Sequence, residues 1–306
     1  MKSNVVRIAM QDKQPGQVEH EEMVAETAKA PAVQPTSPLA ASKWLGRERW
    51  QGIIRVTVLP LFTFAIVIGI WLFIHLHVVK EIPSPLDVWH KAVEIFADPF
   101  YDKGPNDMGI GWQVMYSLGR VMAGFGLAVA VGVPIGFLMG MSPTFRTAWQ
   151  PLIQILRPVS PLAWLPIGLL LFRAVDPSAI FVIFITCIWP TLVNTAAGVQ
   201  AVPKDYLNVA AVLRLGKWEI ATKILLPATL PYIMTGMRLS LSIAWMVIVA
   251  AEMLTGGIGI GFYIWDEWNN LNVPSIIVCI ILIGLVGIAL EGVMSAFQKH
   301  FDYNQR

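Results

Sequence analysis

The amino-acid sequence predicts an all-α membrane protein, and three observations support this fold class. The chain of 306 residues is 56% hydrophobic and only 14% charged, whereas soluble domains carry about 25% charged residues. Apolar runs recur that are long enough to cross a bilayer, which takes about 20 residues. Lys and Arg are concentrated in one set of the connecting segments, as the positive-inside rule expects of a multi-pass membrane protein.

Six apolar runs are candidates for membrane-spanning helices. They are Val56 to Val79, Val114 to Met139, Leu152 to Phe172, Ile180 to Val199, Tyr232 to Leu254 and Ile276 to Phe297. Prolines interrupt the third run, and proline kinks a membrane helix where neighbours can satisfy the carbonyl groups that it leaves free. Two interpretations of this kink stay open, a bent helix that lines a pore or a simple packing kink.

Residues 1–50 differ from the rest of the chain in composition. They are rich in charged, Ala, Gln and Pro residues and contain no short apolar core of the kind that a signal peptide needs. Such a segment buries too little apolar surface to fold alone. We therefore expect a flexible cytoplasmic N-terminal tail at 1–50 and a transmembrane domain at 51–306.

The basic residues predict the orientation of the six spans. The flanks at 43–55, 146–157, 204–223 and 299–306 are richer in Lys and Arg than the opposite set, in which acidic residues outnumber the basic ones. The richer set is assigned to the cytoplasm. Both termini are then cytoplasmic, which agrees with an even number of spans, and so is the segment 200–229.

Composition and motifs exclude several other classes of function. The net charge is only +2 and no basic stripe exists, so no nucleic-acid partner is expected. The His and Cys residues lack metal-ligand spacing, and we expect no metal site and no catalytic residue. The GGIGIG run at 256–261 fits a tight backbone reversal or a close helix approach, not a nucleotide loop. No GxxxxGK[ST] motif is present in the sequence, so ATP would have to bind to another chain.

The most informative segment is Asn208 to Pro227, NVAAVLRLGKWEIATKILLP, between the fourth and fifth predicted spans. Most helix connections are shorter, about 2–8 residues. The segment resembles the cytoplasmic coupling loop, or EAA loop, of ATP-binding-cassette (ABC) importer permeases, whose consensus is Glu-Ala-Ala, three residues, Gly, nine residues, Ile, one residue, Leu-Pro. Aligned on Leu226 and Pro227, the sequence matches at Ala210 and Ile224 but has Asn208, Val209 and Arg214 in place of Glu, Ala and Gly.

The resemblance implies that this loop docks on an ATPase subunit. Ala210 and Ala211 would let a short helix seat closely in the partner's groove, and Gly216 would end that helix with a positive φ. The coupling residues that the resemblance implies are Asp205, Tyr206, Asn208, Ala210, Ala211, Arg214, Gly216, Leu226 and Pro227.

Further segments resemble one branch of these permeases, the group for nitrate, sulfonate, taurine and bicarbonate. They are SLGRVMAGF at 117–125, GVPIGFLMG at 132–140, SPLAWLPIGLLLF at 160–172, WPTLVNTAAG at 189–198 and VAAEMLTGGIGIGFYIWD at 249–266. Within the branch the sequence is most similar to the nitrate permeases, and the bicarbonate permeases are close relatives.

The resemblance implies a type I ABC importer-like transmembrane domain in the bacterial plasma (inner) membrane. The expected partners are a second permease copy, two cytoplasmic ABC ATPase subunits that bind ATP and Mg, an extracytoplasmic substrate-binding protein, and membrane lipid. The chain itself would bind no cofactor and catalyse no reaction. Its expected cargo is a small inorganic anion, nitrate or nitrite first, with bicarbonate, cyanate or a sulfonate as alternatives. The competing class is an ion-gradient-driven secondary transporter, which would need paired repeats and midplane charges of which the sequence gives little sign.

Polar residues in or near the spans are candidates for the translocation pathway. Arg120 and Glu252 fall in the outer half, where they either form a buried pair that locks spans together, which we favour, or leave Arg120 facing the pore. Asn194 and Thr195 can hydrogen-bond an oxyanion or a neighbouring helix. Arg173 occupies a position where the family more usually has Gly, and it either adds positive potential at the entry or snorkels to the surface.

Overall fold

The computed structural model describes residues 57–104 and 107–301. The predicted tail at 1–50 lies outside the described residues. The chain divides into two compact units, Met1–Ile68 and Gly69–Arg306. The described residues of the first unit include the start of α4 (Leu59–His77), and the second unit holds the end of α4 and all the other described helices.

The described residues of the second unit are almost entirely helical, with one isolated β-bridge between Asp102 and Met108. After α4 the helices are α5 (Pro85–Ala97), α6 (Ile110–Met141), α7 (Pro143–Leu156), the 3₁₀-helix η2 (Pro161–Trp164), α8 (Leu165–Phe172), α9 (Val175–Ala201), α10 (Lys204–Val212), α11 (Lys217–Glu219), the π-helix η3 (Ile220–Leu225), α12 (Leu226–Thr255), α13 (Ile260–Asn269) and α14 (Val273–Phe301).

The predicted spans are recovered with one change. Five helical segments are long and apolar enough to cross a membrane, namely α4, α6, α9, η3 with α12, and α14. The third predicted span is instead a broken pair, in which α7 and the η2–α8 segment meet at 95°. Pro158 lies in the break, and Pro161 and Pro166 begin η2 and α8, where a missing N–H leaves no helical hydrogen bond unmade. The predicted kink is therefore a break, and the pair counted as one span brings the total to six.

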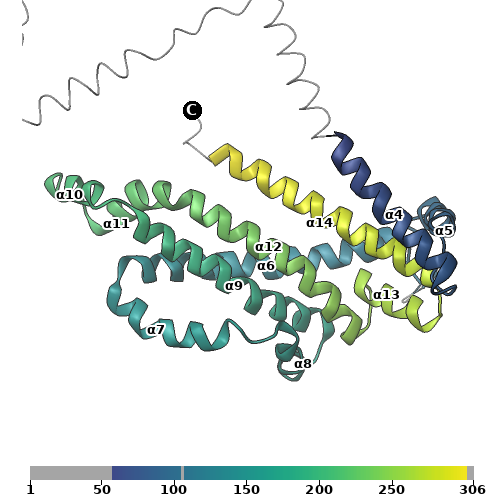
Figure 1. Ribbon diagram of the computed structural model, residues 1–306. Helices are drawn as coiled ribbons and strands as arrows, with labels where there is room; N and C mark the ends of the chain where they lie inside the picture. The colour runs from purple at the N-terminus through teal and green to yellow at the C-terminus, as the bar shows by residue number, and fades with distance from the viewer. Residues whose placement is uncertain (1–56, 105–106, 302–306) are drawn as a thin grey trace, which may run out of the picture. The chain divides into compact units, whose positions relative to one another are not determined.

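Helices α6, α9 and α12 form the centre of the second unit and lie side by side (Figure 1). Each contributes fully buried side chains to one apolar cluster, among them Val121 of α6, Ile183 of α9 and Ile248 of α12. Trp245 of α12 extends the cluster towards α14, where its indole N–H donates to the carbonyl oxygen of Ile283 at 3.0 Å. The core thus links three of the spans and anchors a fourth.

Glycines bring α6 into backbone contact with α9. A methyl group added at Gly124 would lie 2.9 Å from the carbonyl oxygen of Ile180, and one at Gly136 would lie 2.6 Å from that of Leu192. Helix association in lipid depends on close packing and not on water exclusion, so small residues collect at such interfaces. The glycine face of α6 therefore sets its separation from α9.

Helix α5 is a short amphipathic helix with a defined N-terminal cap. Ser84 and Asp87 form a capping box, in which the Ser84 N–H donates to the Asp87 carboxylate at 3.0 Å and the Asp87 N–H donates to the Ser84 hydroxyl at 3.2 Å. The hydrogen bonds from the Ser84 hydroxyl and then from its N–H hold the pKa of Asp87 below its ordinary value. This cap fixes the start of a helix that packs against α14.

Gly136→Ala is expected to lower the thermal stability of the detergent-solubilised protein, because its methyl group would overlap backbone as well as Thr195. Overpacking of this kind costs about 1–3 kcal/mol. Gly126→Ala on the same helix is the matched control, since nothing lies within 4 Å of its added methyl group. A thermal scan in which the two variants unfold at the same midpoint would contradict this account of the α6–α9 contact.

Candidate functional site

The predicted coupling loop begins with α10, which ends in a Schellman motif. The N–H of Leu215 donates to the Ala210 carbonyl at 3.0 Å, and the N–H of Arg214 donates to the Ala211 carbonyl at 3.1 Å. Arg214 has a φ of 51° and so takes the left-handed conformation. The prediction that Gly216 ends this helix with a positive φ is wrong, because Arg214, at the consensus Gly position, makes the reversal. A left-handed non-glycine residue costs about 1–2 kcal/mol.

Gly216 instead starts the next helical stretch. Its N–H donates to the Glu219 carboxylate at 3.1 Å, and Lys223 donates to the same carboxylate at 2.9 Å. The bond from Lys223 and then that from Gly216 hold the pKa of Glu219 below its ordinary value. From here α11, η3 and α12 follow without an intervening loop, so that Leu226 and Pro227 lie inside one continuous helical segment.

The side chains of this loop divide into a buried and an exposed set. Ala210, predicted to contact a partner, is instead fully buried within the chain. Asp205, Asn208, Ala211 and Arg214 are exposed. Five apolar side chains are exposed as well, and we call this group the coupling face. It consists of Tyr206, Val209, Val212, Leu213 and Trp218. Exposed apolar groups are candidate contact surfaces, so a contact surface of α10 would consist of these side chains and not of the buried Ala210.

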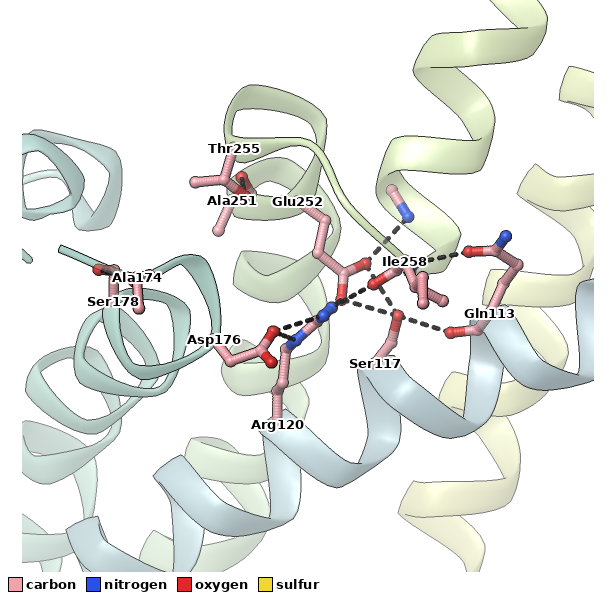
Figure 2. Close-up of polar contacts among 12 residues, drawn as sticks. Gln113, Ser117, Arg120, Ala174, Asp176, Ser178, Ala251, Glu252, Thr255 and Ile258 are labelled. Atoms are coloured by element: carbon pink, nitrogen blue, oxygen red, sulfur yellow. Dashed lines mark hydrogen bonds and ion pairs between the residues drawn. The ribbon is translucent and has the colours of Figure 1, made fainter. Parts of the chain in front are cut away.

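At the other end of α12 the structure brings Arg120 and Glu252 together, as favoured from the sequence (Figure 2). Arg120 Nη1 lies 2.6 Å from Glu252 Oε1, and both residues are buried. The guanidinium also donates to Asp176, from Nε at 2.9 Å and from Nη2 at 2.7 Å. Arg120 therefore joins α6 to both α9 and α12.

The same cluster holds the GGIGIG run in place. Arg120 donates to the carbonyl oxygen of Ile258 at 2.6 Å, and the N–H groups of Gly259, Ile260 and Gly261 donate to Gln113, Ser117 and Glu252 at 2.6, 3.0 and 3.0 Å. Gly256 and Gly257 have φ values of 78° and 94°, which let the chain turn back after α12. The run is thus a backbone reversal whose polar groups are satisfied by side chains, as the sequence predicted in outline.

The other predicted pathway residues lie apart from this cluster. Thr195 is buried against Gly136 and donates to the Thr191 carbonyl at 2.7 Å, so in this conformation it faces α6 and not an open path. Asn194 donates to the Pro190 carbonyl at 2.8 Å. Arg173 is exposed and caps α8 with a φ of 53°, the left-handed conformation that suits the usual Gly.

Sequence reasoning missed three residues that matter here. Ser117 donates to Glu252, and Asp176 shares Arg120 with Glu252. Arg238 lines a cavity of about 270 Å³ between α12 and α14 whose wall also contains Glu291. Arg238 could have been found, since it is an ionisable group inside the fifth predicted span. Ser117 could not, because a serine near a helix end is ordinary.

The arrangement supports clamping and not chemical catalysis. The Asp176 and Glu252 carboxylates neutralise the Arg120 charge. The Glu252 carboxylate in turn accepts hydrogen bonds from the guanidinium and from the backbone of the GGIGIG run. Within residues 57–104 and 107–301, no group of three or more His, Cys, Asp or Glu side chains is placed to hold a metal ion. The structure thus has a clamp at one end of α12 and an exposed coupling face near the other end. These two features are typical of the membrane subunit of a transporter.

Comparison with known proteins identifies the family. The family model described as "Binding-protein-dependent transport system inner membrane component" matches residues 132–305. The chain belongs to this family of ABC importer permeases and is a multi-pass inner-membrane protein.

The chain is similar both to nitrate permeases and to bicarbonate permeases. It is 44% identical over 232 residues to the "Nitrate import permease protein NrtB" of Synechocystis sp., covering 76% of this chain and 84% of that protein. It is 41% identical over 265 residues to the "Bicarbonate transport system permease protein CmpB" of Synechococcus elongatus, covering 86% and 93%. The fold resembles inward-facing structures of the MetNI methionine ABC transporter, with a TM-score of 0.54 at 12% identity over 62% of this chain and 94% of that chain.

Arg120→Ala is expected to destabilise the protein by about 3–5 kcal/mol, because it leaves the buried Glu252 carboxylate without its cation. The double variant Arg120→Ala with Glu252→Gln should recover part of this loss. Asp176→Asn is the control, since that side chain is 64% exposed and exposed pairs contribute about 0–1 kcal/mol. Thermal unfolding and gel filtration measure the effect. Normal stability of Arg120→Ala combined with reduced anion uptake would assign Arg120 to the pathway instead.

Proposed function

We propose that this chain forms the membrane pathway of an ATP-driven importer for a small inorganic anion, nitrate or nitrite first and bicarbonate second. The observation that carries the proposal is the sequence identity of 44–45% to two nitrate permeases over three quarters of the chain or more, with a third nitrate permease at 40%. Bicarbonate permeases, at 41–42% identity, fall within the same range, which keeps bicarbonate as the alternative, ahead of cyanate and sulfonates. Family membership leaves the ion-gradient alternative without support.

The assembly that we propose contains a second copy of this permease, two cytoplasmic ATPase subunits that bind ATP and Mg, and an extracytoplasmic substrate-binding protein. The permease would catalyse no reaction itself and would hold no cofactor. Residues 51–306 would form the transmembrane domain with the coupling loop at 200–229, and residues 1–50 a cytoplasmic tail. Both termini would face the cytoplasm, as the distribution of Lys and Arg indicates.

We propose that the coupling face docks on an ATPase subunit. Its apolar side chains are exposed although the loop carries a cytoplasmic pattern of charge, which is what a protein interface requires. Movement of α10 would pass through Gly216 and Glu219 into the continuous helix that ends near the Glu252 clamp. ATP-driven closure of the ATPase subunits would thereby tilt the spans between inward-open and outward-open states.

Val212→Arg is expected to uncouple ATP hydrolysis from transport, because Val212 is 83% exposed on the coupling face and a charge there would disturb an apolar contact. Loss of a hot-spot contact costs about 2 kcal/mol or more. The measurements are co-purification of the ATPase subunits and uptake for each ATP hydrolysed.

Two variants control this experiment. Leu271→Arg changes an equally exposed apolar residue, 80% exposed, between α13 and α14 and should leave docking intact. Ala210→Arg should instead destabilise the loop itself, since Ala210 is fully buried. Wild-type coupling in Val212→Arg would show that the coupling face is not the docking surface.

ATP-dependent uptake of labelled nitrate into vesicles tests the cargo. The vesicles would hold this permease with its co-purifying ATPase subunits and the substrate-binding protein, and unlabelled bicarbonate would be the competitor. We expect nitrate uptake that requires ATP and resists bicarbonate. Uptake of bicarbonate alone would retain the ABC architecture and replace the cargo, whereas uptake of neither anion would refute both nitrate and bicarbonate as cargo.

A further inference from the structure

A small cavity lies beside the break between α7 and α8. Its volume is about 160 Å³, and its wall includes Arg157 and Trp164 at the break, Thr186 and Trp189 of α9, and Ile243 of α12. At about 30 Å³ per water molecule, it has room for roughly five waters, or for one small inorganic ion with part of its hydration shell. It is too small for a drug-sized ligand, which needs about 300 Å³ or more.

The cavity lies near the middle of the membrane-spanning region. Thr186 and Trp189 are close to the midpoint of α9, and Ile243 is close to the midpoint of α12. The positive-inside pattern places Arg157 in a cytoplasmic flank, but Arg157 caps the far end of the 14-residue helix α7 and lines this cavity. Non-helical backbone at membrane depth is tolerated only where protein covers it or where it lines a water-filled cavity. The cavity therefore accounts for the non-helical backbone at the break.

The wall of this cavity offers hydrogen-bond donors that have no partner. No hydrogen bond or ion pair joins the Arg157 guanidinium or the indole N–H of Trp164 or Trp189 to another side chain or carbonyl in the described part of the chain. The Thr186 hydroxyl is occupied, since it donates to the Val182 carbonyl at 2.6 Å. One cation, on the exposed side chain of Arg157, and two half-buried neutral donors thus border the same cavity without a protein partner among the described residues.

The charge of the wall separates this cavity from others that contain an arginine. Arg120 shares its cavities with Asp176, and Arg238 shares one with Glu291. The wall around Arg157 contains no acidic residue. An isolated guanidinium within a membrane is costly unless a counter-ion or water solvates it. This cavity therefore favours an anion, whereas Arg120 and Arg238 each share their cavities with a carboxylate.

We propose that this cavity is a transient binding site for a monovalent inorganic oxyanion midway through the permease. Arg157 supplies the positive charge, and the indole N–H groups of Trp164 and Trp189 supply directed donors to the anion oxygens. The inference deepens the proposed function and rests on it for the identity of the anion. A single cation in a small cavity binds weakly, which suits a pathway because an anion that binds tightly is not released.

Chloride NMR line broadening by the assembled permease–ATPase complex, without the binding protein, tests the site directly. Chloride is the probe, and nitrate and bicarbonate are added as competitors. We expect Arg157→Gln to weaken the competable chloride binding by about tenfold or more, as loss of a charged hydrogen bond predicts, and Arg157→Lys to retain much of it. Trp189→Phe should give a smaller loss. Arg146→Gln and Trp149→Phe, both on α7 but outside the cavity wall, are the matched controls.

The outcomes separate this inference from the proposed function. Loss of competable binding in Arg157→Gln, with retention in Arg146→Gln and correct assembly of both by gel filtration, supports the site. Equal binding in both variants overturns it, whatever the wild type transports. Failure of Arg157→Lys to bind better than Arg157→Gln would also overturn it, because the charge would then not be the cause. Failure of the wild type to import either anion would refute the proposed cargo and leave the binding result to decide the site.

Discussion

The structure depends on one constraint, that every polar backbone group inside a bilayer must find a partner within the protein. Unbroken helices such as α14, whose proline is only the second residue, meet this constraint within the helix. Where the helices break, the protein meets it in two ways. After α12, side chains of α6 take the exposed N–H and carbonyl groups of the GGIGIG run. At the break between α7 and α8, a cavity with free donors adjoins the irregular backbone. The first break is sealed by protein, and the second is open to a small solute.

Helix α12 connects the two ends of the permease. Its N-terminal extension through η3 and α11 begins at the Gly216–Glu219 cap, beside the coupling face, and its C-terminal turn contributes Glu252 to the outer clamp. A π-helix at the join widens the helix by one residue per turn, and π-helical turns often occur at functional sites. The helix passes the cavity midway, at Ile243. Cytoplasmic loop, central cavity and outer clamp are therefore all in contact with one element.

The sequence predicted the helical class, five of the spans and the pairing of Arg120 with Glu252, because hydropathy and isolated intramembrane charges are local signals. It failed where the answer depended on three-dimensional contacts. Gly216 was assigned the helix end because glycine is the usual residue there, yet Arg214 takes that conformation within a complete Schellman motif. The small size of Ala210 suggests a close contact with a partner, but Ala210 is buried within this chain, where only a small side chain fits. The charge of Arg157 predicts a cytoplasmic flank, since nothing local in the sequence reveals that Arg157 borders a cavity beside the midpoint of α9.

The glycine face of α6 also restricts how the molecule can move. Helices separated by side chains can slide or rotate as those side chains change rotamer, but Gly124 and Gly136 bring α6 to within van der Waals distance of the α9 backbone. Any rotation between the two would open a void or force atoms to overlap, and packed interiors resist both. Helices α6 and α9 must then shift as one rigid body. In a transport cycle, the segments that move relative to this pair are those connected to it through the break at Arg157 and through the coupling loop.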